Sequence, residues 1–259
     1  MLFLYKLLLM LKGPYILLFI LFFYAQALMA QPFDTIRIDQ GNGWQAIQIL
    51  GNKTILAEGT MKNNLKEGVW NSYWETGFPQ EITAYRNGKK NGLYVKTGAD
   101  GYVEQMATYT NDLLNGPYRL YNKGAFILEE IYFKNGIKNG SYTKWYNNGN
   151  KQEQCTFIKE LKDGAANWYY ENGKKAALYH YKNGQMHGKA ITYNEQEEVT
   201  EEGSYEHDEQ SGPWKEYYNG KKIKAEGNYS NGEKNGIWKE YDTNGKTTRT
   251  IEYKNGKEL

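Results

Sequence analysis

Cysteine is the first side chain to consider for covalent chemistry in this sequence. Cys155 is the only cysteine, so it can form neither an intramolecular disulfide nor a cysteine-rich metal site. A single thiol can act as a nucleophile where its surroundings lower its pKa. Cys155, however, occupies a position of a 24-residue repeat at which other units carry residues such as Ile131 and Tyr179. We therefore interpret Cys155 as a packing residue.

Histidine is the next candidate, because imidazole binds metals and transfers protons. The chain has three histidines, His180, His187 and His207. No two of them have the spacing of an HxxxH or HExxH metal motif. His187 and His207 stand at positions where other units carry Asn, which indicates turn residues, and His180 lies in an expected strand. The sequence therefore predicts no metal site and no cofactor.

Carboxylates are numerous and occur in adjacent pairs at residues 129–130, 197–198 and 201–202. Two carboxylates can act as acid and base in glycoside hydrolysis. Here the pairs stand in expected strands or in the turns before them, in different units and beside lysines, which is typical of a solvated sheet face. No helix is expected after the N-terminal segment, so a phosphate-binding loop has no helix to precede. We therefore expect that the protein is not an enzyme.

Aromatic side chains are the remaining candidates for function. The 259 residues include 24 Tyr, 28 Gly and only 5 Pro, and aromatics make up 15% of the chain. This composition favours many short strands joined by turns over disorder. Aromatic residues also anchor protein interfaces, so the elements that position them decide between packing and binding.

Glycines at a constant spacing of 24 residues define a repeat. We number the positions of each unit from this glycine, which is slot 0. Slot 17 is aromatic in every unit, slot 2 is aromatic in six of the eight units, and slot 5 is aromatic in all units except the one with Thr97. The slot-0 glycines are Gly68, Gly92, Gly116, Gly140, Gly164, Gly188, Gly212 and Gly236.

Turn residues divide each unit into two strands. Asn-Gly pairs recur through the chain, and both residues tolerate the positive φ of a type I′ turn. We expect one tight turn near slots 8–9 and a wider turn across slots 19–24, separating two stretches of about 6–8 residues. The predicted fold is all-β, an elongated antiparallel single-layer sheet of tandem 24-residue β-hairpin repeats, about 75 Å long for sixteen strands.

The parity of the aromatic slots leaves one question open. Slots 2 and 5 differ in parity, so a flat strand places them on opposite faces. Either both faces carry aromatic side chains or a β-bulge realigns the two slots. Slots 15 and 17 share parity and are expected to share a face.

Residues 1–30 have the composition of an export signal. Two lysines precede an apolar run that ends at Tyr24, and small residues follow it. We predict a signal peptide that is cleaved after Ala27 or Ala30, and therefore an exported protein that is periplasmic, cell-surface or secreted. The alternative is an uncleaved anchor, which needs the apolar runs before and after Pro14 to act together, because a spanning helix takes about 20 residues.

The remaining chain divides into a cap and an array. Residues 31–67 lose the phase of the repeat in their first part and look like a degenerate unit in their second, so we interpret them as an N-terminal cap. Residues 68–259 hold the eight complete units. Outside residues 1–30 the chain is formally neutral, which argues against binding nucleic acid or an anionic membrane by bulk charge.

Several stretches resemble a known repeat family. The sequences YRNGKKNGLY, YKNGQMHGKA, YSNGEKNGIWKEYDTNG and FKNGIKNGSYTKWYNNG are similar to bacterial MORN-variant repeats of the YwqK-type antitoxin repeat family. The resemblance covers residues 52–259. It implies single-layer arrays of β-hairpins that act as interaction platforms.

We therefore expect an exported, non-catalytic scaffold that mediates protein–protein interaction, with a glycan as a possible ligand. Two alternatives stay open: a carbohydrate- or cell-wall-binding module, and an antitoxin- or immunity-like protein that neutralises a toxin. No nucleic acid, and no membrane contact beyond the signal segment, is expected. Slots 2 and 5 vary more between units than slot 17 does, which favours a role in recognition. We expect Tyr121, Trp145 and Tyr169, the slot-5 residues of three adjacent units, to lie near one another on a partner-facing surface.

Overall fold

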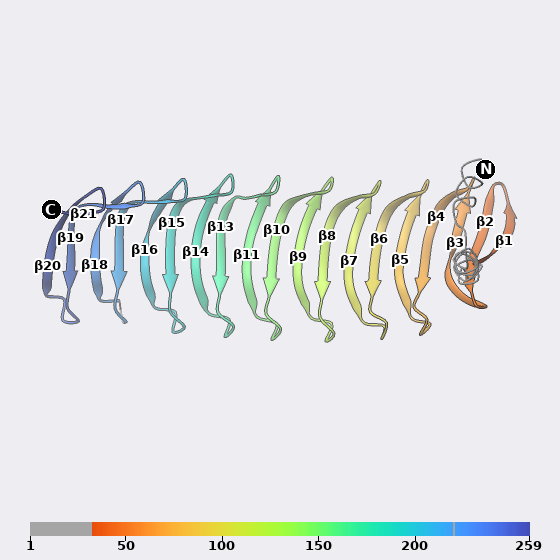
Figure 1. Cartoon of the computed structure of the whole chain (residues 1–259), viewed down its shortest axis with the longest axis horizontal. Helices are drawn as coiled ribbons and strands as arrows, with labels where there is room; N and C mark the ends of the chain where they lie inside the picture. The colour runs from red at the N-terminus through yellow and green to blue at the C-terminus, as the bar shows by residue number, and fades with distance from the viewer. Residues whose placement is uncertain (1–32, 220) are drawn as a thin grey trace, which may run out of the picture.

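A computed structural model describes residues 33–219 and 221–259. In this part of the chain all regular structure is β-strand, arranged as one open sheet (Figure 1). This confirms the predicted elongated, antiparallel, single-layer sheet of tandem hairpins. The predicted signal peptide, residues 1–30, lies outside the described residues. Within the described part there is no helix that is long and apolar enough to cross a membrane.

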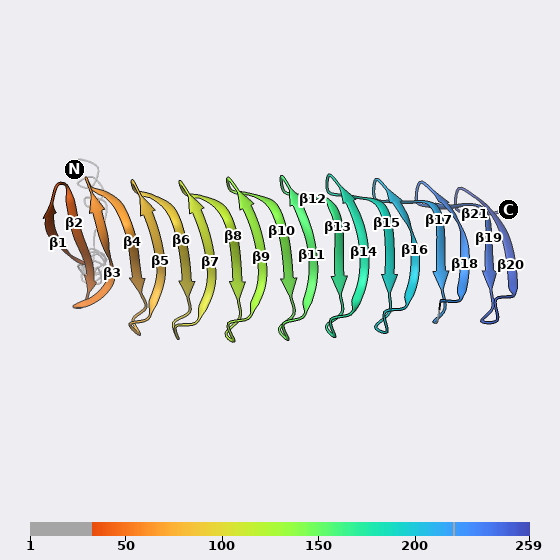
Figure 2. The same ribbon diagram turned by 180° about the vertical axis from the view of Figure 1, so that it is seen from behind.

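The strands follow one another across the sheet in sequence order, from β1 at one end to β20 and β21 at the other, as seen from both sides (Figures 1 and 2). Each strand pairs antiparallel with its neighbours in the chain, and β12 and β13 together pair with β11 as one interrupted strand. The strands are β1 (Asp34–Gly41), β2 (Trp44–Gly51), β3 (Thr54–Lys62), β4 (Leu65–Tyr73), β5 (Pro79–Arg86), β6 (Lys89–Thr97), β7 (Val103–Thr110), β8 (Leu113–Tyr121), β9 (Ile127–Lys134), β10 (Ile137–Trp145), β11 (Lys151–Ile158), β12 (Leu161–Lys162), β13 (Gly164–Tyr169), β14 (Lys175–Lys182), β15 (Gln185–Tyr193), β16 (Val199–Glu206), β17 (Glu209–Tyr217), β18 (Ile223–Ser230), β19 (Glu233–Tyr241), β20 (Thr247–Lys254) and β21 (Lys257–Glu258).

The two kinds of turn lie along opposite long edges of the sheet, and they fall within the predicted slots, but the prediction of which turn is tight and which is wide was wrong. The tight turn occupies slots 19–20, as in Asn87-Gly88, where φ is 50° and 78° and a two-residue type I′ turn forms. The five-residue loop occupies slots 6–10, as between β4 and β5. There the Gly77 amide donates to the Trp74 carbonyl, and Gly77 has a φ of 87°.

The slot-0 glycine lies inside a strand rather than in a turn. Gly92 has a φ of 113°, and the pairing of β5 with β6 shifts register between Thr83 and Tyr85, opposite this glycine. The second Asn-Gly of the unit, Asn91-Gly92, is therefore a β-bulge, which also favours positive φ. Asn-Gly satisfies both structures, and this is why the sequence pattern did not distinguish the bulge from a wider turn.

The bulge leaves slots 2 and 5 on opposite faces, so both faces of the sheet carry aromatic side chains. In β4 the opposite partners Trp70 and Thr83 place slots 2 and 15 on one face, which we call the slot-2 face. Slot 17 shares this face, because Tyr94 at slot 2 contacts Tyr109 at slot 17. Slots 15 and 17 thus share a face, as their parity predicts. Slots 1, 3, 5, 14 and 16 lie on the other side, which we call the slot-5 face.

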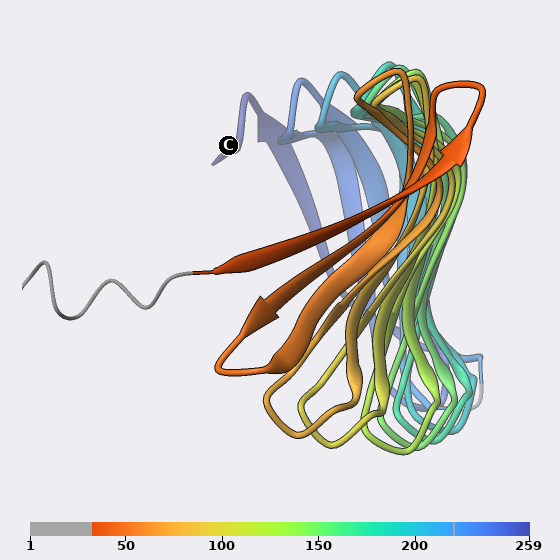
Figure 3. The ribbon, with the colours of Figure 1, turned by 90° about the vertical axis from the view of Figure 1, so that its right-hand side faces the viewer.

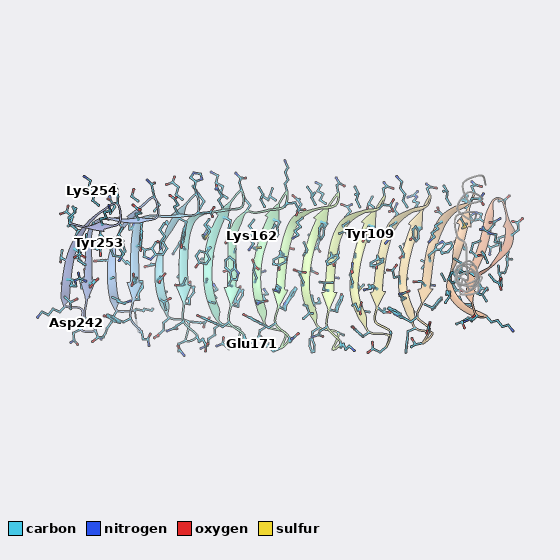
Figure 4. The ribbon with its side chains drawn as sticks, in the orientation of Figure 1. Tyr109, Lys162, Glu171, Asp242, Tyr253 and Lys254 are labelled. Atoms are coloured by element: carbon cyan, nitrogen blue, oxygen red, sulfur yellow. The ribbon has the colours of Figure 1, made fainter. Side chains whose placement is uncertain are left out.

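The sheet is curved and twisted rather than flat. Viewed from the end that carries β1, the strands are bent along their length, and successive hairpins are rotated relative to one another (Figure 3). Tyr109, Lys162 and Tyr253 lie in the half of the sheet near the tight turns (Figure 4). Glu171 and Asp242 lie at the edge formed by the five-residue loops. Residues 34–62, in β1 to β3, continue the same sheet.

Candidate binding face

The slot-2 face is packed by aromatic rings that lie over small residues of the preceding unit. A Cβ atom added to Gly227 would lie 2.3 Å from Cδ2 of Trp238, and one added to Gly203 would lie 1.9 Å from Cε3 of Trp214. Both rings are therefore in direct contact with glycine backbone. Trp238 has an exposed fraction of only 1%. A tryptophan at slot 2 thus requires glycine at slot 15 of the unit before it.

The sizes of the two facing residues are related at several positions of the array. Where slot 2 is tryptophan, the facing residue is always glycine; where slot 2 is tyrosine, it is Ala, Thr or Ile; and where slot 2 is alanine, it is Cys or Tyr. The pairs are Gly59 with Trp70, Thr83 with Tyr94, Ala107 with Tyr118, Ile131 with Tyr142, Cys155 with Ala166, Tyr179 with Ala190, Gly203 with Trp214, and Gly227 with Trp238. Close packing explains why glycine accompanies each tryptophan and why the large Tyr179 stands opposite Ala190, whereas the pair of Cys155 and Ala166 does not follow this compensation.

The unit with Ala166 shows how the packing adjusts locally. Tyr179 lies opposite Ala166 in one neighbouring strand and Ala190 in the other. Trp168, at slot 4, packs edge-to-face on Tyr179 with 5.4 Å between ring centroids. In this unit the large side chains therefore stand at slots 4 and 15 instead of slot 2, and the face remains packed.

Lysines two residues before slot 0 lie over these rings. Nζ of Lys234 is 4.0 Å from the centroid of Trp238, and Nζ of Lys66 is 4.3 Å from that of Trp70. Burial lowers the pKa of Lys66, and the positive charge of Lys90 lowers it further. Cation–π attraction holds such ammonium groups against the ring faces. The aromatic surface of the slot-2 face is thus used largely within the fold.

Cys155 belongs to this packed layer. Its exposed fraction is 5%, and it pairs with Tyr142 across the hairpin. Burial raises the pKa of the thiol to about 11, and the carboxylate of Glu153 acts in the same direction. A protonated, buried thiol is a poor nucleophile. The surroundings of Cys155 are those of a packing residue.

The slot-5 face carries the predicted binding residues. Tyr121, Trp145 and Tyr169 are the last residues of β8, β10 and β13, and each is partly exposed. One intervening strand separates each from the next, which places neighbouring positions about 10 Å apart. The structure therefore brings the three to equivalent positions on one face, next to the edge of five-residue loops. Whether a partner contacts them stays a prediction.

Hydrogen bonds hold part of the slot-5 row in place. The hydroxyls of Tyr217 and Tyr241 donate to the slot-14 carboxylates Glu202 and Glu226 of the preceding unit. The hydrogen bond and burial raise the pKa of Tyr217, with burial as the larger cause. The hydroxyl of Tyr121 lies 3.3 Å from Sδ of Met106 at the same slot. The slot-5 row is thus ordered by contacts between units.

Sequence reasoning missed two features, one in the five-residue loops beside this face and one on the face itself. The slot-6 aromatic side chains bond to the next unit, as when the Tyr146 hydroxyl donates to the Tyr169 carbonyl at 2.9 Å. Exposed apolar side chains also occur here, at slot 1 in Val69 and Leu93 and at slot 16 in Tyr132. The 24-residue spacing of Val69 and Leu93 was visible in the sequence, but the exposure of these side chains depends on which face they occupy.

Comparison with known repeats agrees with this architecture. Four segments match the repeat described as the MORN repeat variant, at residues 138–159, 162–183, 210–231 and 234–255. Each match runs from two residues before a slot-0 glycine to slot 19, which is one hairpin with its five-residue loop. No curated protein matches the chain. The chain therefore carries repeats similar to the MORN repeat variant, in units that are structurally equivalent along the array.

Proposed function

We propose that this protein is an exported, non-catalytic scaffold that binds another protein through the slot-5 face of its sheet. The proposal rests on a difference in side-chain burial between the two faces of the sheet. The slot-2 side chains Trp70, Trp214 and Trp238 are buried against glycine backbone, whereas the slot-5 Tyr and Trp side chains are partly exposed on a face that also carries exposed apolar residues. MORN repeats commonly serve as binding modules, which supports the same role.

The chemistry of the slot-5 face favours a protein partner. Large aromatic side chains bring contact area at a small cost in conformational entropy and often dominate interface energies. On this face they stand in a periodic row beside exposed Val69 and Leu93. A partner that presents a complementary extended surface would contact several units at once. Affinity would then be only moderately sensitive to salt, since exposed ion pairs would contribute little.

Site-specific cross-linking tests which face binds. Ser141 and Lys144 are both exposed, lie in the same strand β10 and stand on opposite faces. We would introduce a single reactive cysteine as Ser141→Cys on the slot-5 face or Lys144→Cys on the slot-2 face, and attach the same photo-cross-linker to each. Buried Cys155 provides a matched background in both variants.

The proposal requires that a protein from the extracytoplasmic fraction cross-links to the Ser141→Cys variant and much less to the Lys144→Cys variant. Equal cross-linking from both faces, or preferential cross-linking from Lys144→Cys, would contradict the assignment of the binding face. Recovery of a polysaccharide instead of a protein would support the carbohydrate-binding alternative.

A further inference from the structure

All three histidines of the chain lie within two neighbouring hairpins, although they are scattered in sequence. His180 is in β14, His187 is at the bulge of β15, and His207 is in the tight turn between β16 and β17. The ring centroids of His187 and His207 are 5.6 Å apart, with an interplanar angle of 66°. We propose that His187 and His207 form a binding site for a divalent transition-metal ion.

The repeat itself brings these two positions together. The residue before slot 0 reaches the tight turn of the next hairpin in other units, where Asn115 Oδ1 accepts from the backbone amide of Asn135 at 3.3 Å. Asn139 accepts in the same way from Lys159. His187 and His207 occupy the positions of Asn115 and Asn135. Twenty residues separate them in sequence, so no local spacing motif reveals the pair.

The hydrogen bonding of His207 suits a metal ligand. Its Nδ1 lies 3.2 Å from Oε1 of Gln185. An amide oxygen only accepts, so Nδ1 carries the proton and Nε2 keeps its lone pair. Metal-binding histidines usually donate their second ring N–H to an oxygen in this way, which fixes the tautomer and the ring orientation. His207 is exposed, and its free nitrogen is therefore accessible to an ion from solvent.

The charge around the pair favours a cation. The turn reads Glu206-His207-Asp208-Glu209, and Glu206 lies directly opposite Glu209 across it. Like charges in opposite positions of a hairpin repel each other, and a bound cation would relieve this repulsion. Asp208 is already engaged, because its Oδ1 accepts from the Met186 amide at 2.7 Å.

The donor set indicates the class of ion. Imidazole nitrogen suits Zn²⁺, Ni²⁺ and Cu²⁺, whereas Mg²⁺ and Ca²⁺ prefer oxygen ligands. No group of three or more His, Cys, Asp or Glu residues is placed to hold a metal within residues 33–219 and 221–259. The two imidazoles would therefore supply two ligands, and water would supply the remaining ones.

The repeat supplies conservative variants for the test. His187→Asn and His207→Asn each introduce the residue that other units carry at the same slot, so the fold is expected to persist. His180→Asn is the matched control, because His180 Nδ1 already bonds the Lys189 carbonyl at 3.0 Å. Gln185→Ala tests the orienting hydrogen bond. Each tag-free protein would be titrated with Zn²⁺ by isothermal calorimetry, and thermal unfolding would be measured with Zn²⁺ and with EDTA.

We expect wild type and His180→Asn to bind one Zn²⁺ ion and to unfold at a higher temperature with Zn²⁺ than with EDTA. His187→Asn and His207→Asn should lose both effects while unfolding like wild type in EDTA. Gln185→Ala should weaken binding about tenfold, as for other groups that orient metal ligands. Ca²⁺ should give no heat of binding. Failure of wild type to bind Zn²⁺, or equal binding by His187→Asn and His207→Asn, would overturn the proposal.

Discussion

At the scale of single residues, the facing positions of slots 2 and 15 decide how the sheet packs. Trp238 lies on Gly227, where a methyl group would come within 2.3 Å of the ring. Gly227 does not have the positive φ that would itself exclude other residues. The glycine is therefore required by the neighbouring ring and not by its backbone. This separates it from glycines such as Gly92, whose φ of 113° demands glycine for conformational reasons.

Substitution of Gly227 tests this size rule. Gly227→Ala should destabilise the protein by about 1–3 kcal/mol, the usual cost of overpacking. Adding Trp238→Tyr should restore part of the loss, because Ala with Tyr is the combination found in the native pair Ala107 and Tyr118. Urea denaturation of the two single variants and the double variant would give the coupling energy. Strictly additive effects would show that the two residues do not share a packing site.

Cys155 gives a second test at this scale. The thiol should react slowly with iodoacetamide at neutral pH in the folded protein, because burial raises its pKa to about 11 and limits access. It should react quickly in denaturant. Cys155→Ser should cost about 1 kcal/mol and leave partner binding unchanged. Rapid modification of the native protein would show that the thiol is accessible and would contradict its assignment as a packing residue.

At the scale of strands and hairpins, the period of the repeat and the approximate positions of its turns were predictable, but which of the two turns is the tight one was not. Regular Gly and aromatic positions identify two strands in each unit. Asn-Gly, however, suits both the type I′ turn at Asn87-Gly88 and the bulge at Asn91-Gly92. Only strand pairing distinguishes the two. The row of Tyr121, Trp145 and Tyr169 followed from the period, whereas the contact of His187 with His207 requires the register between hairpins.

Deletion of whole units tests modularity at this scale. Removing residues 116–139 brings Ala107 opposite Tyr142, a combination like the native Ala107 and Tyr118. This protein should fold, with lower stability because one unit is lost. Removing residues 188–211 also deletes 24 residues but brings Tyr179 opposite Trp214, which overpacks the layer by about 1–3 kcal/mol.

Each deletion removes one 24-residue unit, so a difference between their unfolding temperatures reports the new pair of facing residues and not the loss of a repeat. We expect the 188–211 deletion to unfold at the lower temperature. A twelve-residue deletion should prevent folding, because it interrupts the alternation of strands. Equal unfolding temperatures for the two 24-residue deletions would argue against size compensation between slots 15 and 2.

At the scale of the whole molecule, stability should fail at high pH. Burial raises the pKa of Tyr85, Tyr109, Tyr205 and Tyr229, and that of Tyr217 to about 12. A raised folded-state pKa favours the neutral phenol in the folded protein. These groups therefore contribute stability that is fully present below the unfolded tyrosine pKa of about 10 and is lost as pH rises through the folded values.

Spectrophotometric titration of tyrosine, together with circular dichroism, measures this behaviour. Most tyrosinate absorbance should appear together with the loss of β-structure, above a pH of about 10. Unfolding at neutral pH, or full ionisation of tyrosine in a sheet that stays folded, would disagree with the burial of these rings.

The most direct test of the account compares Trp145→Ala on the slot-5 face with Phe157→Ala on the slot-2 face of the same hairpin. Phe157 packs edge-to-face on Tyr142 with 5.6 Å between centroids, and Lys138 lies over its ring. For each variant, the free energy of unfolding and the affinity for the cross-linked partner would be measured. We predict that Trp145→Ala weakens binding with little change in the free energy of unfolding. Phe157→Ala should lower the free energy of unfolding by no more than about 3–5 kcal/mol, the cost for a buried phenylalanine, because its ring is partly exposed. Unfolding of Trp145→Ala to the same extent as Phe157→Ala would contradict the division between a packing face and a binding face.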